Sequence, residues 1–511
     1  MRQFATALLF FAALTLAFAP LGAPPPASAQ QQEGGREQSS AREQASARDP
    51  LPAAVSTSHT VETEEGPLAF TATAGSIRLV DDAGAARADI AYVAYLRDGD
   101  GDDGARRPIT FAVNGGPGAA SAYLNIGALG PWRLPVGLET ITPSQSVDLV
   151  DNAETWLAFT DLVFVDPVGT GFSRLANTSG ALRNQFLSID GDIEALSEFV
   201  YRWLVENGRV GSPKYFVGES YGGFRGPLLA ESLQTDYGLA LAGMTLLSPV
   251  LDFGWREQPD YAPLPKVSLL PSLAAAAMER RGGFSREALA EVEEYAAGEY
   301  LADLMRGLSD DEALARASER VASLTGLDPD LVRRRAGRID MQLFAREIAR
   351  DDDAIASLYD AGVTAGDPAP ASGFVRAADP VLDGLTAPLT SGMLALYGEK
   401  LSWSPSRRYI LLNSGVSRAW SWGRGRSQPE AVSALRRVMA LDGDFQLLVV
   451  HGYTDLVTPY FESALVLRQV RDFDGRVRLE NYPGGHMFYT RDESRRAFRD
   501  DAARLYGGRA P

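Results

Sequence analysis

A serine flanked by glycines is the first feature of the sequence that could do chemistry. Residues 218–222, GESYG, fit the pattern G-x-S-x-G, which exposes the serine hydroxyl when it joins a strand to a helix. A β-rich apolar run precedes Ser220, and two glycines and the helix-like segment PLLAESL follow it. Small residues beside the serine let its hydroxyl stand clear of the backbone. We therefore predict that Ser220 is a nucleophile and not part of an incidental turn.

Such a nucleophile needs a general base, because a hydroxyl is weakly nucleophilic at its own pKa. The chain has only three histidines, His59, His451 and His486. His486 lies in the glycine-rich loop YPGGHMFY, directly after the last predicted strand. His59 lies in an early run of strands, and His451 ends a strand, where a structural role is more common. We predict that His486 is the base.

A carboxylate is needed in turn to hold the imidazole in one tautomer and to stabilise its charged form. Asp455 lies in HGYTDLVTP, a short loop after the penultimate predicted strand. Asp472 and Asp474 are alternatives, although their segment RDFDG has the character of a solvated turn. The chain order Ser220, Asp455, His486 is the order expected for an α/β-hydrolase, and the chemistry it predicts is acyl transfer.

Acyl transfer also needs N–H donors for the oxyanion that develops on the reacting carbonyl. The turn itself places the backbone N–H of Tyr221. A second donor is expected in residues 111–121, FAVNGGPGAAS, whose glycines leave main-chain N–H groups uncovered, and we predict Gly116. A phosphate-binding loop is the alternative, but this segment lacks the pattern G-x-x-x-x-G-K-[ST] and has no lysine.

These residues need a sheet whose strand ends converge. Residues 59–96 alternate in short runs broken by EEG and DDAG, which predicts antiparallel strands joined by tight turns. Apolar runs that look buried on both faces follow, separated by helical stretches, the clearest at 190–206. The runs are ITFAV (109–113), LVFVD (162–166), YFVG (215–218), MTLLSP (244–249), QLLVVHG (446–452) and VRLENY (477–482). Strands that alternate with helices predict an α/β fold with a mostly parallel central sheet.

Residues 256–428 interrupt this alternation. Much of the region has helical spacing and many charges, and the segment from a capping box at Ser309 to Gly326 predicts one clear helix. We predict a largely helical cap inserted between two parts of an α/β-hydrolase core, at 51–255 and 429–511. An independent second domain is the alternative.

The composition excludes several other kinds of chemistry. The 511 residues include no cysteine, which rules out a thiol nucleophile, disulfides and cysteine-ligated metals. The only lysines are Lys214, Lys266 and Lys400, so Schiff-base chemistry has few candidates. The net charge of −17 opposes binding to phosphate backbones, and we expect no nucleic-acid partner. The predicted chemistry calls for no metal and no organic cofactor.

The first residues predict export. Arg2 is followed by the apolar run ALLFFAALTLAFAPLG and by ASA at 27–29, which fits a signal-peptide cleavage site. We predict a signal peptide at 1–29 and a disordered linker at 30–50, which lacks apolar periodicity. The apolar run is short for a membrane span, so we expect no stable membrane anchor; an uncleaved anchor is the alternative. The mature protein is predicted to be periplasmic or secreted, and its oligomeric state is left open.

Blocks of sequence in a fixed order resemble the serine carboxypeptidase family. They are NGGPG (114–118), VDPVGTGFSR (165–174), GESYGG (218–223), HGYTDLVTP (451–459) and GGHM (484–487). The resemblance implies an α/β-hydrolase fold with an inserted cap, the triad and oxyanion donors named above, and peptide substrates with a free C-terminus. It also implies that Asn114 and Glu219 hydrogen-bond the substrate's terminal carboxylate. A protonated Glu219 could share a proton with that carboxylate, which would need a raised pKa.

The chain departs from the family pattern at several positions. Ala119 stands where a cysteine is usual, Val113 where a tryptophan is common, and DPVG at 166–169 lacks the usual glutamine. Ala128 stands where a second carboxylate-binding glutamate is expected. This difference weakens the expectation of carboxypeptidase specificity and of an acidic pH optimum. The sequence predicts an exported, bacterial-type serine carboxypeptidase. An esterase or acyltransferase on the same machinery, and a non-catalytic binding protein that keeps only the fold, are the alternatives.

Overall fold

The computed structural model describes residues 50–99, 106–135, 137, 142–144, 148–371, 378–423, 425, 427–471 and 475–507. The predicted signal peptide and all but the last residue of the predicted linker lie outside this part of the chain. Asp472 and Asp474, the alternatives to Asp455, also lie outside it.

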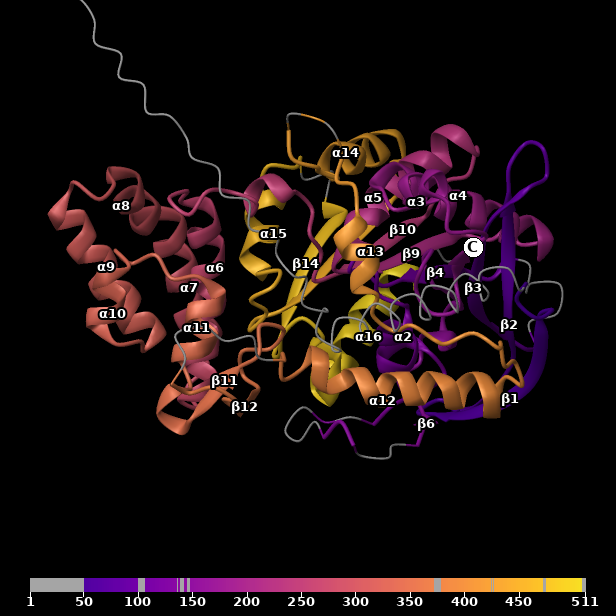
Figure 1. Cartoon of the computed structure of the whole chain (residues 1–511), viewed down its shortest axis with the longest axis horizontal. Helices are drawn as coiled ribbons and strands as arrows, with labels where there is room; N and C mark the ends of the chain where they lie inside the picture. Colours follow the sequence, from indigo (N-terminus) through magenta and orange to yellow (C-terminus); the bar gives the residue numbers. More distant parts are fainter. Residues whose placement is uncertain are drawn as a thin grey trace, which may run out of the picture. The chain divides into compact units, whose positions relative to one another are not determined.

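A ten-stranded mixed sheet forms the centre of the described chain (Figure 1). Strands β1, β2 and β3 form its antiparallel side, and from β7 onward the neighbours β7-β4-β9-β10-β13-β14 run parallel. The strands are β1 (Val55–Thr63), β2 (Gly66–Val80), β3 (Ala86–Arg97), β4 (Ile109–Val113), β7 (Asp161–Val165), β8 (Arg174–Leu175), β9 (Lys214–Glu219), β10 (Gly243–Leu247), β13 (Gln446–Gly452) and β14 (Val477–Tyr482). This sheet, with helices between its parallel strands, is an α/β-hydrolase fold and confirms the predicted fold class.

The central strands form where the sequence is apolar on both faces. Strands β4, β13 and β14 have the predicted bounds, and β7, β9 and β10 differ by one or two residues at their ends. Every residue of β4, β7, β9 and β10 is buried, as expected for parallel strands covered by helices on both sides. The edge strand β1 has a mostly exposed or half-buried pattern instead.

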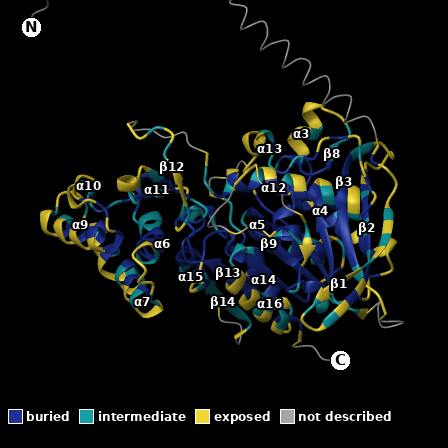
Figure 2. Ribbon diagram, turned by 90° about the horizontal axis from the view of Figure 1, so that it is seen from below, coloured by how far each residue is buried: buried dark blue, intermediate teal, exposed yellow. Residues whose placement is uncertain are grey.

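Two hydrophobic cores lie against the sheet. Trp203, Leu233 and Leu435 pack in one of them, and Phe498 and Leu385 pack in the other. Figure 2 shows the central strands in the buried colour and the outer faces of several helices in the exposed colour. The helices of the first core are α4 (Ile189–Glu206), α5 (Tyr221–Asp236) and α14 (Val432–Leu441), and those of the second are α2 (Ala122–Leu124), α12 (Leu382–Ala395) and α16 (Asp492–Gly507).

The chain between β10 and β13 is largely helical. Its helices and strands are α6 (Leu264–Arg280), α7 (Arg286–Tyr295), α8 (Leu301–Arg306), α9 (Asp311–Thr325), α10 (Pro329–Arg334), α11 (Met341–Glu347), β11 (Ala354–Ala356), β12 (Thr364–Gly366), α12, α13 (Ser414–Ala419) and α14, with shorter turns given below. Helices α6 to α11 share a third core, which reaches Tyr460 and Phe461 on α15 (Tyr460–Leu467). Helix α12 packs in one of the sheet cores instead. The domain limits at 256 and 428 stay a prediction.

Shorter elements complete the described chain. They are α3 (Gly180–Phe186), β5 (Trp132–Arg133), β6 (Val150–Asp151), the 3₁₀ turns Trp156–Ala158, Phe253–Trp255, Arg350–Asp352 and Phe488–Thr490, and the π turns Asn125–Leu129, Ala296–Tyr300 and Leu396–Lys400.

The start of α9 corrects one detail of the sequence prediction. The capping residue is Asp310 and not Ser309, because the Asp310 carboxylate accepts the Ala313 N–H at 3.0 Å. Aspartate and serine cap helices about equally well, so adjacent candidates are not separated by residue type. The predicted end is confirmed, since Gly326 adopts the left-handed conformation at the C-cap.

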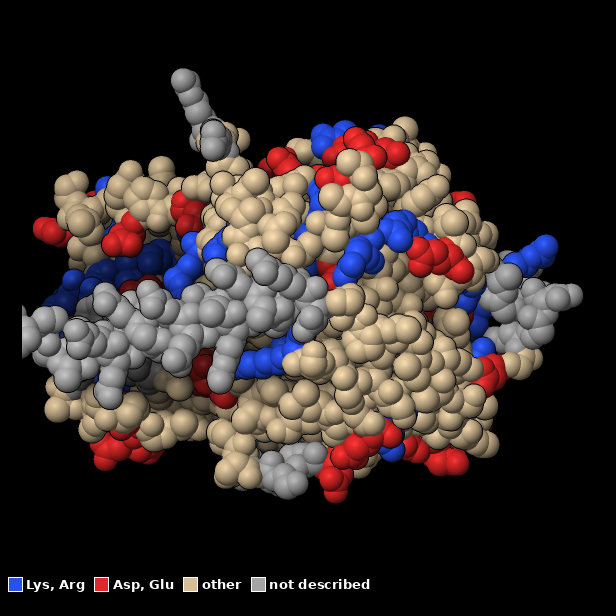
Figure 3. Space-filling view, turned by 45° about the vertical axis from the view of Figure 1, so that its right-hand side comes forward, with Lys and Arg blue, Asp and Glu red and all other residues tan. Residues whose placement is uncertain are grey.

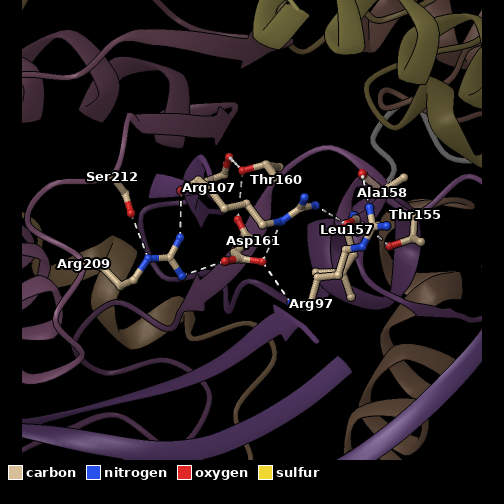
Figure 4. Close-up of polar contacts among 10 residues, drawn as sticks. Arg97, Arg107, Thr155, Leu157, Ala158, Thr160, Asp161, Arg209 and Ser212 are labelled. Atoms are coloured by element: carbon tan, nitrogen blue, oxygen red, sulfur yellow. Dashed lines mark hydrogen bonds and ion pairs between the residues drawn. The ribbon is translucent and has the colours of Figure 1, made fainter. Parts of the chain in front are cut away.

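A buried ion-pair cluster lies at the amino ends of the central strands (Figure 4). Asp161, the first residue of β7, is paired with Arg209 at 2.6 Å and with Arg107 at 3.1 Å, and it accepts the Arg97 N–H at 3.0 Å. The carboxyl ends of the same strands, where the predicted site residues follow, lie at the opposite edge of the sheet. Asp161 is therefore a buried carboxylate that serves the fold away from that site.

Charged side chains of both signs are interspersed on the face shown in Figure 3. Among the residues that the structure describes, no helix combines the length and the apolar composition that crossing a membrane would require.

Candidate active site

The predicted site residues follow the carboxyl ends of neighbouring strands. Gly116 comes after β4, Ser220 after β9, Asp455 after β13 and His486 after β14. The strand order β4-β9-β10-β13-β14 brings these loops to one edge of the sheet, which is where α/β folds bind ligands.

Ser220 occupies a strained turn between β9 and α5. Its φ of 61° and ψ of −121° lie outside the regions that non-glycine residues favour. A Cβ on Gly218 would meet the Gly222 carbonyl oxygen at 2.2 Å, and one on Gly222 would meet the Val113 carbonyl oxygen at 2.3 Å. The glycines are therefore required by the close approach of the backbone, and the turn leaves Ser220 partly exposed. Strain of this kind clusters at functional sites.

His486 and Asp455 form a buried pair. The Asp455 Oδ2 atom accepts the His486 Nδ1–H at 2.7 Å and the Thr458 hydroxyl at 2.6 Å. The Asp455 Oδ1 atom accepts the backbone N–H groups of Val457 and Thr458 at 2.8 and 2.9 Å. Asp455 is thus saturated with donors in one orientation and fixes the imidazole from its Nδ1 side.

Burial and pairing have opposite effects on the pKa values of these two groups. Burial by itself would raise the pKa of Asp455, but the charge of His486 and the hydrogen bonds to the carboxylate lower it below its ordinary value. Burial would lower the pKa of His486, but the Asp455 carboxylate outweighs it and the pKa is raised. The pair can therefore hold a proton on the imidazole more readily than an isolated histidine would.

Ser220 and His486 are anchored to the same turn after β10. The Ser220 N–H donates to the Leu247 carbonyl at 2.8 Å, and the next residue, Ser248, donates its hydroxyl to the His486 carbonyl at 3.0 Å. No hydrogen bond joins the Ser220 hydroxyl to the His486 ring within the described ranges. Bonds between nucleophile and base are often long or poorly aligned before a substrate binds.

The glycine loop after β4 packs directly against the Ser220 turn. A Cβ on Gly115 would lie 2.5 Å from the Tyr221 backbone nitrogen and 2.6 Å from the Glu219 carbonyl oxygen. Gly116 has a φ of 104°, which an L side chain rarely adopts. In the part of the chain described, neither Gly116 nor Tyr221 donates its N–H to another protein group. Both N–H groups are therefore open to an acceptor.

Glu219 and Asn114 lie beside the His486–Asp455 pair. The Glu219 carboxyl is buried and accepts the Tyr489 hydroxyl at 2.8 Å, and Asn114 is buried with its Oδ1 accepting the Leu124 N–H at 3.0 Å. Burial raises the pKa of Glu219 to about 7, although His486, Tyr489 and Asn114 each lower it. A glutamate with this pKa is part protonated near neutral pH, as sharing a proton with a carboxylate would require.

The other two histidines lie outside this arrangement. His451 is fully buried on β13 with its Nε2 bonded to the Ser463 hydroxyl at 2.8 Å, and burial lowers its pKa to about 4. His59 lies on β1, bonds Thr57 at 2.8 Å and packs edge-on against the Trp132 ring. Among the described residues, no three histidine, aspartate or glutamate side chains are grouped so that they could hold a metal ion.

Sequence reasoning missed Arg225 on α5. Its guanidinium pairs with Asp192 of α4 at 2.6 Å, donates to the Asn114 carbonyl at 2.5 Å and lies over the Tyr221 ring at 4.7 Å. Arg225 therefore holds the loop after β4 against both helices. Tyr221, Arg225 and Leu229 are spaced four residues apart, so they lie on one face of a helix. An arginine on this otherwise apolar face was the signal in the sequence that could have indicated a buried charge.

Removing Arg225 is expected to destabilise the fold. We predict that Arg225→Met lowers the free energy of unfolding by about 3–5 kcal/mol, because Asp192 is left buried without its partner. Denaturant unfolding measures the change. Arg437→Met is the control, because Arg437 pairs with Glu231 on the surface and its loss should cost about 1 kcal/mol or less. Equal losses in the two variants would contradict the structural role of Arg225.

One segment of the chain is similar to a known protein family. A family model described as Serine carboxypeptidase matches residues 94–253. This segment holds Asn114, Gly116 and Ser220 but neither Asp455 nor His486. Over this segment the chain is similar to the serine carboxypeptidases, in agreement with the sequence blocks that lie in it.

The chain spans only about a quarter of the length of the curated relatives that it matches. "Serine carboxypeptidase-like 50" from Arabidopsis thaliana is 36% identical over 117 residues, which are 23% of this chain and 24% of the relative. "Pheromone-processing carboxypeptidase kex1" from Aspergillus niger is 32% identical over 155 residues, which are 29% of this chain and 23% of the relative. These two relatives come from a plant and a fungus, so the bacterial type expected from the sequence stays a prediction.

A solved proline iminopeptidase from Mycobacterium smegmatis is also similar, at 13% identity over 88% of this chain and 98% of that one. Its TM-score is 0.33. The fold assignment rests on the strand order of this chain.

Proposed function

We propose that this protein is a serine-type carboxypeptidase that works through an acyl-enzyme. Ser220 Oγ attacks the carbonyl carbon of the C-terminal peptide bond while His486 Nε2 takes its proton, and Asp455 stabilises the imidazolium. The N–H groups of Gly116 and Tyr221 hold the oxyanion. His486 then returns the proton to the leaving amine, and a water molecule, deprotonated by His486, releases the shortened peptide.

The buried His486–Asp455 pair beside the Ser220 turn is the observation that carries this proposal. The 2.7 Å bond leaves Nε2, the second ring nitrogen, for the nucleophile, and the raised pKa suits a base that must hold a proton during the reaction. A non-catalytic binding protein would have no need for a strained serine turn next to such a pair. The match of residues 94–253 to the serine carboxypeptidases supports the same class.

Glu219 and Asn114 are proposed to bind the substrate's terminal carboxylate. Their burial beside the pair and the pKa of Glu219 near 7 support this role, because a part-protonated glutamate can donate to a carboxylate. Ala128 instead of a second glutamate favours a different candidate, an esterase or acyltransferase on the same machinery.

Matched substrates separate the two candidates. We expect a blocked dipeptide with a free C-terminus to be cleaved with a kcat/KM about 100-fold above that of its C-terminal amide, because the amide lacks the charge that the site would recognise. The methyl ester of the same dipeptide measures acyl transfer without a free carboxylate. Rapid ester cleavage with no preference for the free acid would replace the carboxypeptidase by the esterase.

We also propose that the protein is exported, on the basis of the apolar run and the ASA site at 27–29. Amino-terminal sequencing of the protein from periplasm and medium tests this. A mature form that starts near residue 30 is expected, and full-length protein confined to the cytoplasm would contradict it.

A further inference from the structure

Glu219 is held by a phenol from the loop that carries His486. The Tyr489 hydroxyl, three residues after His486, donates to Glu219 Oε2 at 2.8 Å, and the Tyr489 side chain is 1% exposed. A Cβ on Gly127 would lie 3.3 Å from the Tyr489 ring, so a glycine in the π turn Asn125–Leu129 leaves the room that the ring needs. The same turn contains Ala128, the position at which a second glutamate was expected.

A second phenol in this region makes no hydrogen bond of normal geometry. The Tyr123 side chain on α2 is 4% exposed, and its hydroxyl meets no acceptor or donor in hydrogen-bond geometry. Burial raises the pKa of Tyr123, and the charges of Tyr359 and Glu219 raise it further, while the Thr386 hydroxyl lowers it as a weak hydrogen-bond partner that lies outside the geometry of a formed bond. Leaving a buried hydroxyl without a partner costs free energy, which a ligand that accepts from it would recover.

We propose that Tyr489 and Tyr123 complete the recognition site for the substrate's terminal carboxylate. Tyr489 is a positioning residue that fixes the Glu219 carboxyl, and Tyr123 is a specificity residue that donates to the carboxylate itself. This inference rests on the proposed carboxypeptidase function and adds two residues that the family resemblance did not supply. It also gives a physical answer to the loss at Ala128, because the Tyr123 hydroxyl takes over the donor role of a protonated glutamate.

Phenols differ from a carboxylic acid in how they respond to pH. Both tyrosines have raised pKa values through burial, so both keep their protons at neutral and mildly alkaline pH. Of Glu219, Tyr123 and Tyr489, Glu219 is the group whose pKa, about 7, lies near neutrality. The titratable groups that act on it are His486, Asp455 and Tyr489, and its own charge acts on Tyr123.

The two hydroxyls should have separable effects. The Tyr489 bond favours the ionised form of Glu219, so removing it raises the pKa of that carboxyl. In the wild-type enzyme we expect the KM for the free acid to increase with pH as Glu219 loses its proton. In Tyr489→Phe this KM should be about tenfold higher at low pH, and its increase should begin at a higher pH than in the wild-type enzyme. In Tyr123→Phe the KM for the free acid should be about tenfold higher than in the wild-type enzyme at every pH, and the midpoint of its pH dependence should be unchanged.

The experiment measures kcat and KM across the range in which Glu219 titrates, with the blocked dipeptide acid, its amide and its methyl ester. For both variants we expect the KM values for the amide and the ester to change by less than about twofold, because neither substrate has the carboxylate. Tyr460→Phe is the matched control, since it removes a 2.7 Å phenol–carboxylate bond to Glu293 and should alter none of these values.

The outcomes distinguish this inference from the function on which it rests. If the wild-type enzyme has no preference for the free acid, the carboxypeptidase assignment fails and the inference fails with it. If the preference exists but both variants keep the wild-type KM and midpoint, only the inference is overturned. An equal loss on all three substrates would reduce the tyrosines to structural residues. Turnover of the ester shows that a variant is folded. If Tyr489→Phe does not turn over the ester, the result for Tyr123→Phe decides whether the inference holds.

Discussion

Replacing His486 by alanine is expected to lower kcat by about 10⁴- to 10⁶-fold, while replacing His451 leaves most of the activity. The imidazole at 486 has its Nδ1 fixed by Asp455 and is the only histidine that we place at the Ser220 turn. Steady-state kinetics on the blocked dipeptide and on its ester measures both variants. The loss should be the same on the two substrates, because both need the Ser220 hydroxyl to be deprotonated.

His451 is a matched control because it is also buried and lies on β13, the neighbour of the strand β14 that precedes His486. Its Nε2 bonds Ser463, and His451→Ala should lower the free energy of unfolding by about 1–3 kcal/mol through the unpaired hydroxyl and the cavity. If His451→Ala abolished activity and His486→Ala retained it, the assignment of the base would be reversed.

Replacing Asp455 by asparagine is expected to lower kcat by about 10⁴-fold. The Val457 and Thr458 N–H groups both donate to Oδ1, so an amide oxygen is held at that position. The amide NH₂ then faces Nδ1 of His486, which must become an acceptor and carry its proton on Nε2. That tautomer cannot accept the proton of Ser220, and single-turnover kinetics should locate the loss in acylation.

Asp161→Asn provides the comparison for Asp455→Asn. Asp161 is also a buried carboxylate, but it binds Arg107 and Arg209 at the opposite edge of the sheet (Figure 4). We expect it to lower stability and to leave kcat within about threefold of the wild-type value. Comparable losses of kcat in the two variants would mean that loss of a buried charge, and not the tautomer of His486, explains the effect.

The sheet could be predicted from the sequence because its central strands are apolar on both faces. Strands β4, β13 and β14 have the bounds that the apolar runs predicted, since a short run between polar loops leaves few alternatives. The loops at their ends, with Asp455 and His486, followed from the same reasoning. Once the strand order is known, the meeting of these loops at one edge is a consequence of the fold.

Contacts between residues far apart in the chain could not be predicted in this way. Tyr489 and Glu219 are 270 positions apart, and no local pattern links a phenol to a glutamate on another loop. Arg225 and Asp192 lie on different helices, so their pairing depends on how α4 and α5 pack. These contacts depend on the three-dimensional packing of the chain, and it is through them that Glu219 and Asn114 are held in place.

The most direct test of the account is to identify the residue that a serine-directed fluorophosphonate modifies. Displacement of fluoride by an activated hydroxyl forms a stable phosphonate ester, which peptide mass spectrometry can locate. The account predicts one modified residue, Ser220, no labelling of Ser220→Ala, and much slower labelling of His486→Ala. Labelling at another residue, or undiminished labelling of Ser220→Ala, would contradict the claim that Ser220 is the nucleophile activated by His486 and Asp455.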